Sequence, residues 1–324
     1  MSSSPANEVC FSAGKNNGKA VIVQPIPMGR VAELNEQDCK YNLYLRGIQN
    51  GEIVKEHTFV ESISRCIDPY KDFENYMALA DNPDFRFIVS NTTEAGIEFV
   101  DTCKFDDKPA LSFPGKLTQL LYRRYKNGLN GFIILSCELI DNNGSELKKC
   151  VLKYAELWNL EADFVAWLEN ENHFVNTLVD RIVTGYPRGY ADKVCEELGY
   201  EDKLVDIGEP FALWVIESDK PINNELPLDK IGLPVIFTDN HKPYKERKVR
   251  VLNGAHTSSV LAGYLYGLDI VRDCMSDDLM GKFIRKVVND EIVPQVNLPL
   301  DEVKKLKEEV DIELNKLKEE ELEK

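Results

Sequence analysis

FRFIVSNTT (85–93) decides the fold class, because an uninterrupted apolar run passes directly into a short polar segment. Similar apolar runs occur in KAVIVQPI (19–26), GFIILSCEL (131–139) and FALWVIE (211–217). Continuous rather than alternating apolar residues predict strands covered on both faces, as in a parallel sheet. Amphipathic stretches at 114–128, 145–159 and 188–199 predict intervening helices. We therefore expect an α/β fold with a Rossmann-like parallel sheet.

Two further patterns set the domain organisation. Residues 40–63 alternate around Asn50-Gly51, a strong two-residue turn signal, which predicts an antiparallel hairpin added to the sheet. Long helical periodicity then covers 244–266, 275–294 and 299–323, after a break near Asp239 to Pro243. We expect a dinucleotide-binding domain over 1–240 and a helical substrate domain over 241–324. The last helix carries a narrow apolar stripe, which fits a helix lying on the domain or a short coiled coil: Val303, Leu306, Val310, Leu314 and Leu317.

Composition limits the class of protein. The 324 residues exceed the size at which one core stops growing, and no apolar run is long enough for a membrane helix. The start of the chain lacks the pattern of a secretory signal, and the eight scattered cysteines are typical of reduced cytoplasmic thiols. A net charge of −16 argues against a nucleic-acid partner and favours a small substrate or a protein. None of these features predicts an oligomeric state.

KVRVLNGAH (248–256) is the strongest candidate for chemistry. On an α-helix, Lys248, Asn253 and His256 lie at about 0°, 140° and 80°, an arc that can face one cavity. A lysine amine acts as a general base when burial or nearby positive charge lowers its pKa. The alternative for His256 is a core histidine bonded to a backbone carbonyl. The other histidines show no metal-ligand spacing, so we expect no metal site.

Basic residues crowd the start of the same helix. Five of the ten residues in HKPYKERKVR (241–250) are Lys or Arg. The helix macrodipole disfavours cations at this end, so an anionic ligand is expected to compensate. The alternative is an exposed first turn whose charges are simply solvated.

A second candidate site lies at SNTTEAG (90–96), directly after a predicted parallel strand. Open α/β sheets bind ligands at the carboxyl ends of their strands. The alternative is a plain turn in which Thr92 or Thr93 caps a helix.

These segments together resemble a known family. KVRVLNGAH is similar to the Lys-x4-Asn-x2-His signature of the long-chain, polyol-specific mannitol dehydrogenase family. SNTTEAGI (90–97), SCELIDNNG (136–144), FALWVIE and GYLYGLDIVRD (263–273) look most like the branch that interconverts D-tagaturonate and D-altronate. The resemblance runs from Val21 to about Val303.

The resemblance implies reversible, metal-free, NAD-dependent reduction of D-tagaturonate to D-altronate in hexuronate catabolism. Lys248 would be the catalytic acid/base, while Asn253 and His256 would hydrogen-bond the reacting oxygen and its neighbour. Fructuronate or mannitol-type dehydrogenation remains an alternative, as does a non-catalytic fragment of this fold.

Further contacts follow from the resemblance. The cofactor would be bound by Gln24, at the position that reads the adenosine ribose, and by Asn91, Thr92, Thr93 and Glu94. The substrate would be bound by Lys245, Arg250 and Glu138. Polyol-oxidising relatives carry an acidic residue at the Lys245 position, so a lysine there suits a carboxylate substrate. They carry Asn at the position of Leu139, so that oxyanion contact is not implied here.

Two family features have no counterpart in the sequence. Family members open with a strand and a Gly-rich turn that binds the pyrophosphate, and nothing in residues 1–20 resembles that turn. The helical domain gives way to a charged tail. We therefore expect a dinucleotide domain without its first strand, a truncated helical domain and weakened dinucleotide binding.

Overall fold

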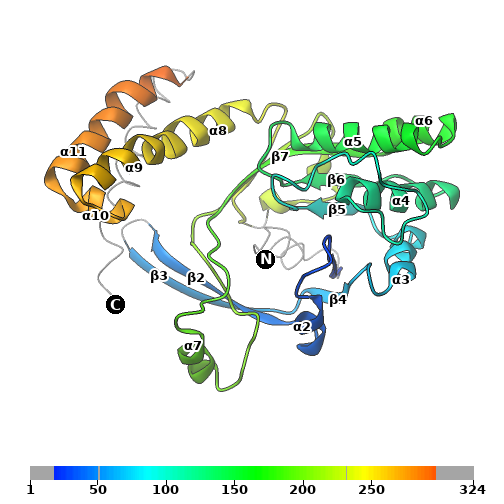
Figure 1. Ribbon diagram of the computed structural model, residues 1–324, viewed down its shortest axis with the longest axis horizontal. Helices are drawn as coiled ribbons and strands as arrows, with labels where there is room; N and C mark the ends of the chain where they lie inside the picture. The colour runs from blue at the N-terminus through cyan, green and yellow to red at the C-terminus, as the bar shows by residue number, and fades with distance from the viewer. Residues whose placement is uncertain (1–17, 50–51, 231, 297–324) are drawn as a thin grey trace. The chain divides into compact units, whose positions relative to one another are not determined.

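The computed structural model describes residues 18–49, 52–230 and 232–296, which form two compact units (Figure 1). Unit 1 comprises the residues up to Tyr44 and His57–Asp239. Unit 2 comprises Leu45–Glu56 and the residues from Asn240 onward. The chain thus passes into the helical unit between Asp239 and Asn240, and a segment of the predicted hairpin groups with that unit as well. The first 17 residues, where no Gly-rich turn was found, lie outside the described ranges.

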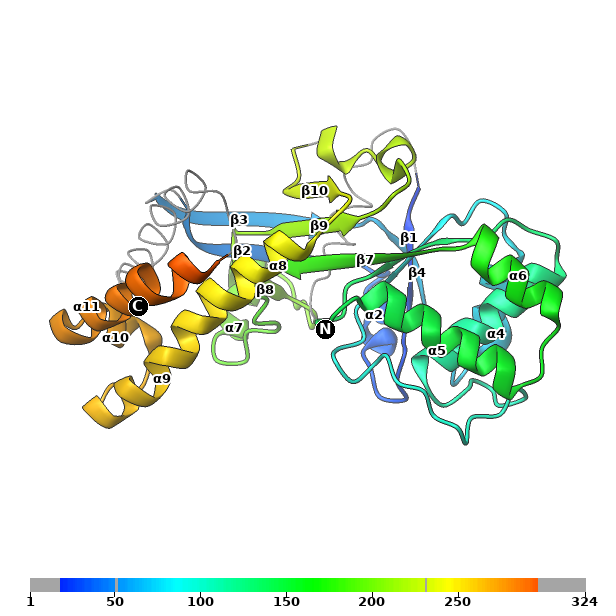
Figure 2. The ribbon, with the colours of Figure 1, turned by 90° about the horizontal axis from the view of Figure 1, so that it is seen from above.

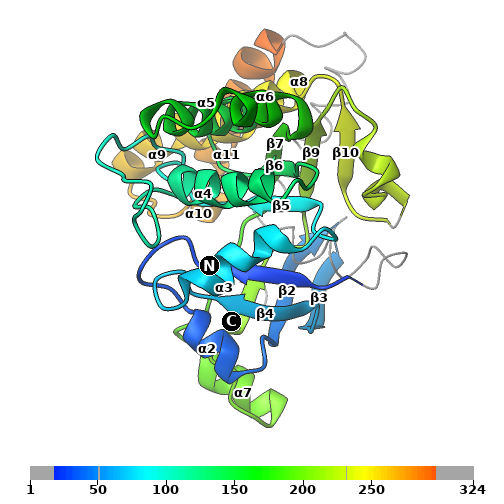
Figure 3. The same ribbon diagram turned by 90° about the vertical axis from the view of Figure 1, so that its right-hand side faces the viewer.

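Unit 1 is built on a five-stranded sheet in the order β10-β9-β7-β6-β5 (Figure 3). Its strands are β5 (Phe87–Ser90), β6 (Ile133–Ser136), β7 (His173–Asp180), β9 (Leu213–Glu217) and β10 (Val235–Thr238). β5, β6 and β7 are parallel, which confirms the predicted core of the fold. The expectation of a wholly parallel sheet is wrong for FALWVIE, because β9 runs antiparallel to β7 and parallel to β10. The apolar composition of a strand is the same whichever way the strand runs, so it cannot predict whether the strand pairs in parallel or antiparallel.

Helices cover one face of this sheet. They are α3 (Phe73–Met77), α4 (Phe113–Lys126), α5 (Asn143–Leu157) and α6 (Ala162–Glu171). Their apolar faces meet the sheet in one cluster that includes Leu121, Ile134, Leu147 and Phe164. The other face is covered in part by Ile222, Leu226 and Leu228, which pack against Trp214. The sheet is therefore buried on both sides, as the apolar runs predicted.

Two smaller sheets complete the strands. Among the described strands, β1 (Ala20–Val23) pairs in parallel with β4 (Ile63–Ile67) alone, so KAVIVQPI does not join the main sheet as expected. β2 (Tyr41–Gln49), β3 (Glu52–Val60) and β8 (Asp206–Gly208) form a sheet in the order β3-β2-β8. The adjacency of β2 and β3 agrees with the predicted hairpin, whose turn lies outside the described residues. Short helices α2 (Val31–Glu36) and α7 (Ala191–Leu198) accompany these strands.

Unit 2 is mainly helical. α8 (Lys242–Arg247), a π-helical turn (Lys248–Asn253) and α9 (Gly254–Tyr266) form one continuous rod (Figure 2). α10 (Val271–Ser276) and α11 (Asp278–Lys286) follow, and then a second π-helical turn (Val287–Ile292) and a 3₁₀ turn (Val293–Gln295). The predicted helix over 299–323, with its apolar stripe at Val303, Leu306, Val310, Leu314 and Leu317, lies outside the described residues.

α9 packs through its small residues. Its buried side chains are Ala255, Ser259 and Gly263, and a Cβ on Gly263 would lie 2.5 Å from the sulfur of Cys274. Its large apolar side chains are 51–76% exposed: Val260, Leu261, Tyr264, Leu265 and Tyr266. Close backbone approach, not side-chain size, therefore sets the buried face of this helix. No described helix is both long and apolar enough to cross a membrane.

Gly144 provides a test of how closely α5 approaches β7. A Cβ at this position would lie 2.5 Å from the carbonyl carbon and oxygen of Val175. We expect Gly144→Ala to lower the free energy of unfolding by about 2 kcal/mol, because a helix pressed against backbone cannot yield locally. Gly189→Ala is the control, since no atom lies within 4 Å of its Cβ position. Urea denaturation with equal midpoints for the two variants would contradict the close approach.

Candidate active site

Polar residues of three parallel strands lie at one level of the sheet in unit 1, at the carboxyl ends of β5 and β6. The register pairs Ser90 with Ser136, and Ser136 with Asn176, while β7 continues to Asp180. The Ser136 hydroxyl is buried and has no hydrogen-bond partner among the described residues. Ligands of open α/β sheets bind at this edge.

The residues after β5 are accessible at this edge. Asn91, Thr93 and Glu94 are exposed, and Thr92 is half-buried. Thr93 adopts a left-handed conformation with φ of 71°, which is uncommon for a residue other than glycine. The alternative helix-cap interpretation is wrong, because the next helix starts at Phe113 and is capped by the hydroxyl of Ser112. The segment is therefore a loop whose first residues are exposed.

Glu138, two residues beyond the end of β6, lies against this loop. Its side chain is buried, and Oε1 accepts hydrogen bonds from the Thr92 amide at 3.1 Å and the Thr92 hydroxyl at 2.9 Å. Oε2 accepts a hydrogen bond from the Ser90 hydroxyl at 3.1 Å. The structure thus brings together two of the residues singled out in the sequence, Thr92 and Glu138. The carboxylate faces the loop in this arrangement.

The rest of the loop is fastened to α4 and α5. The Tyr154 hydroxyl accepts a hydrogen bond from the Val100 amide at 2.8 Å, and the Trp158 indole donates to the Cys103 carbonyl at 3.0 Å. Gln119 donates to the Asp107 carbonyl at 2.8 Å. These anchors were not predicted from the sequence, since nothing in an amphipathic helix pattern distinguishes a polar residue that binds a loop from one that faces water.

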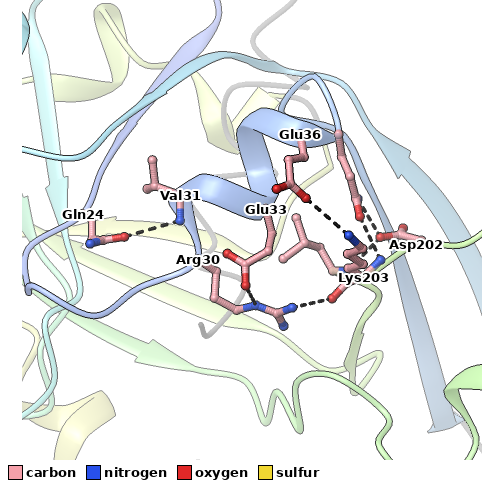
Figure 4. A network of polar contacts seen from close by, with 9 residues as sticks. Gln24, Arg30, Val31, Glu33, Glu36, Asp202 and Lys203 are labelled. Atoms are coloured by element: carbon pink, nitrogen blue, oxygen red, sulfur yellow. Dashed lines mark hydrogen bonds and ion pairs between the residues drawn. The ribbon is translucent and has the colours of Figure 1, made fainter. Parts of the chain in front are cut away.

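Gln24 follows β1 and is enclosed by its own loop. Its side-chain oxygen accepts from the Val31 amide at 3.4 Å, at the start of α2 (Figure 4). Its side-chain nitrogen donates to the Ile26 carbonyl at 2.8 Å. A carboxylate could not make the second bond, which accounts for a neutral residue at this position. The predicted contact with the adenosine ribose stays a prediction.

The segment after α7 is bound to α2. Arg30 donates to the Lys203 carbonyl at 2.8 Å and lies 3.5 Å from Glu33, and the Lys203 ammonium lies 3.3 Å from Glu36 (Figure 4). The buried carboxylate of Asp202 accepts from the amide of Asn42 at 2.8 Å. These contacts hold the loop that follows β1 in a fixed shape, within unit 1.

Unit 2 carries the predicted catalytic residues on the α8–α9 rod. Lys248 and His256 are half-buried and Asn253 is exposed. The residues from Lys248 to Asn253 form a π-helical turn, which the sequence did not predict. A π-turn advances only about 80° per residue, so a residue and its fifth neighbour lie nearly one above the other.

The π-turn changes the arc of the three side chains. Lys248 and Asn253 are separated by about 40–50° instead of the 140° expected for an α-helix. His256 lies three α-helical residues after Asn253, and its side chain therefore points in about the same direction as that of Lys248. The three side chains therefore share an arc of about 60°, narrower than the sequence implied. π-turns of this kind frequently mark functional sites.

Contacts with the second π-turn support the first. The Arg250 guanidinium donates to the Gln295 carbonyl at 2.6 Å, and a Cβ on Gly254 would lie 3.2 Å from Cδ1 of Ile292. Arg250, predicted to bind substrate, thus has a structural contact on this side of the rod. Lys245 is half-buried in α8, and this burial lowers the pKa of its ammonium group.

Gln24 allows the loop after β1 to be tested. We expect Gln24→Glu to lower the melting temperature at neutral pH, because a buried carboxylate would face the Ile26 carbonyl without a proton to donate. The loss should correspond to about 1–3 kcal/mol. It should shrink at pH 4–5, where a carboxyl group can carry the missing proton. A melting temperature equal to that of the wild type at both pH values would show that the amide donor is dispensable.

Comparisons with known proteins agree with this architecture. The family model of the mannitol dehydrogenase Rossmann domain matches residues 13–230, and that of the mannitol dehydrogenase C-terminal domain matches residues 240–312. The altronate oxidoreductase of Phocaeicola vulgatus is 48% identical over 91% of this chain and 62% of its own length. That of Bacillus subtilis is 45% identical over 87% of this chain and 60% of its own length. The chain therefore spans about three fifths of the length of these relatives.

Solved structures show the same fold. A substrate-free D-sorbitol dehydrogenase has a TM-score of 0.82 at 22% identity, over 97% of this chain and 66% of that one. Pseudomonas fluorescens mannitol 2-dehydrogenase, solved with NAD and D-mannitol, has a TM-score of 0.72 at 25% identity, over 89% of this chain and 59% of that one. On the two family models and these relatives, the chain belongs to the mannitol dehydrogenase family.

Proposed function

We propose that this chain carries the catalytic residues of an NAD-dependent reductase that converts D-tagaturonate to D-altronate in the cytoplasm. The proposal rests chiefly on its 45–48% identity to altronate oxidoreductases. The placement of Lys248, Asn253 and His256 on one side of a single helical rod supports it. Because the chain spans about three fifths of those relatives, the activity is proposed for this chain by analogy with longer proteins.

The cofactor would be bound at the polar edge of unit 1. NAD, when bound, supplies or accepts the hydride. Asn91, Thr93 and Glu94 offer exposed polar side chains at the carboxyl end of β5, and the buried Ser136 hydroxyl lies at the same level of the sheet. These groups suit a polar ligand such as a dinucleotide. The relative from Pseudomonas fluorescens was solved with NAD.

Lys248 would handle the proton. Reduction of a ketone places a proton on the carbonyl oxygen, and the Lys248 ammonium would donate it. In the reverse direction the neutral amine would take the hydroxyl proton. Asn253 and His256 would hydrogen-bond the same oxygen and its neighbour, which stabilises the charge that develops there. The narrow arc produced by the π-turn suits three groups that act on one small region of the substrate.

Lys245 and Arg250 would recognise the carboxylate of a hexuronate. Both belong to the basic run at the start of the rod, in a chain whose net charge is −16. A cation that is partly removed from water binds a carboxylate more strongly than an exposed one. An uncharged polyol such as mannitol has no group that would use these cations, so the basic run favours a sugar acid.

Replacement of Lys248 tests the proposed proton transfer. We expect Lys248→Met to slow NADH oxidation with tagaturonate by about 10²–10⁴-fold, the usual contribution of a positioned acid or base. NADH binding, followed by tryptophan fluorescence, should be unchanged. Lys242→Met, an exposed lysine of the same helix, should leave the rate unaltered. An unchanged rate in the Lys248 variant would exclude its role, and a wild-type chain that binds no NADH would favour a non-catalytic fragment.

Lys245 predicts a pH dependence of substrate binding. Its protonated form would bind the substrate, and burial lowers its pKa, so affinity should decline as the pH rises through a value below that of an ordinary lysine. We expect the KM for tagaturonate to increase on the alkaline side in the wild type. Lys245→Arg should keep a low KM to higher pH, since a guanidinium stays protonated. Identical KM profiles for the two proteins, or a preference for mannitol in a substrate panel, would contradict the proposed contact.

A further inference from the structure

Glu138 occupies an unusual position for an acidic residue. Only 2% of its surface is exposed, and its side-chain oxygens accept three hydrogen bonds from neutral donors of Ser90 and Thr92. Burial of a carboxylate is unfavourable unless its oxygens are hydrogen-bonded, and this one has a donor on each oxygen. All three donors belong to the segment that leaves β5. The carboxylate therefore links the end of one strand to the loop that follows its neighbour.

Glu138 is itself held in place from the other side. Its backbone carbonyl accepts a hydrogen bond from the Asn143 side chain at 2.9 Å. Asn143 also donates to the Thr177 carbonyl at 2.9 Å and accepts from the Thr177 amide at 3.0 Å. Asn143 is 1% exposed and begins α5. A buried chain of hydrogen bonds thus runs from β7 through the start of α5 to the loop after β5.

The loop needs such a restraint at this point. The anchors from α4 and α5 hold it from Val100 onward, while Thr93 and its neighbours precede them. Thr93 has a φ of 71°, a conformation that a β-branched residue keeps only when its surroundings impose it. The two hydrogen bonds that Thr92 donates to the Glu138 carboxylate fix the residue immediately before Thr93.

We propose that Glu138 is a positioning residue that sets the shape of loop 91–94 for cofactor binding, in place of contacting the substrate. The role rests on the proposed function, because it assumes that this loop binds the dinucleotide. One carboxylate oxygen serves both donors of Thr92 and the other serves Ser90. A glutamine can reproduce this geometry if the Ser90 hydroxyl turns to accept, whereas an alanine leaves all three donors without a partner.

The test combines hydrogen exchange with cofactor titration. In Glu138→Ala, we expect the Thr92 amide to exchange at least 10-fold faster and the Kd for NADH to rise at least 10-fold. Glu138→Gln should stay within about 3-fold of the wild type in both measurements, because its geometry is conserved. Thr92→Val, which removes one donor and retains the shape, should show an intermediate effect if the alanine variant fails to fold. Glu98→Ala, an exposed acid of the same loop, is the matched control.

The outcomes separate the inference from the proposed function. Unchanged exchange of the Thr92 amide in Glu138→Ala would overturn the positioning role, whether or not NADH binds. Faster exchange with an unaltered Kd would also overturn it. The glutamine variant could instead show normal exchange and normal NADH binding but a raised KM for tagaturonate. That outcome would show that the negative charge of Glu138 contacts the substrate directly. Failure of the wild-type chain to bind NADH would refute the proposed function, while the exchange data would still report on the loop.

Discussion

The in-register parallel pairing of β5, β6 and β7 is the constraint on which the rest of unit 1 depends. Buried strands lack the alternation that usually fixes register, because both of their faces are apolar. Register is marked here by polar residues within otherwise apolar strands. Pairing of Ser90 with Ser136, and of Ser136 with Asn176, brings one polar residue of each strand to the same level, where β5 and β6 end. Every polar contact of the candidate cofactor site starts from this alignment.

The alignment has an energetic consequence. Ser90, Glu138, Asn143 and Thr177 are all buried, and a buried polar group without a partner costs about 1–3 kcal/mol. Each of the four is therefore linked to the next by a hydrogen bond. Such a network specifies one arrangement, since any shift of a strand or helix would leave several groups unpaired at once. An edge whose buried residues Ser90, Glu138, Asn143 and Thr177 are bonded to one another, and which is exposed at Asn91, Thr93 and Glu94, is suited to hold a ligand without moving.

The sequence predicted which segments form helices and strands better than it predicted how these elements pair and pack. Apolar runs identified β5, β6 and β9, and amphipathic periodicity identified α4, α5 and α7. HFVNTLVD, which forms β7, was missed because its apolar residues are interrupted by Asn176 and Thr177, the polar residues that join the strand-end network. The polarity of β9 and the separate pairing of β1 depend on long-range contacts that no local pattern contains. The exposed face of α9 could not be predicted, since its apolar residues surround the helix and only the close approach of Gly263 to Cys274 selects a side.

For the candidate site, the sequence identified the residues but not the directions in which their side chains point. KVRVLNGAH contains neither Gly nor Pro before Asn253, so an α-helix was the natural expectation, and the π-turn is visible only in the backbone. The resemblance implied that Glu138 binds substrate, whereas in the structure its carboxylate accepts hydrogen bonds from Ser90 and Thr92 of the chain itself. Residue type limits the chemistry that a side chain can perform. The direction in which the side chain points depends on the hydrogen-bonding and packing partners around it.

The π-turn also shows where unit 2 depends on its packing. A π-turn is rare and is seldom stable alone, so tertiary contacts have to maintain it. Here Arg250 is bonded to Gln295, and Gly254 leaves room for Ile292, so the second π-turn and the residues after it support the first. Val251 and Ala255 lie in the same apolar cluster as Val288 and Val293. If this support were lost and the rod relaxed to an α-helix, Asn253 and His256 would rotate away from Lys248 by most of a right angle or more. The direction of the proposed catalytic side chains therefore depends on residues 287–296, although none of these carries any of the proposed chemistry.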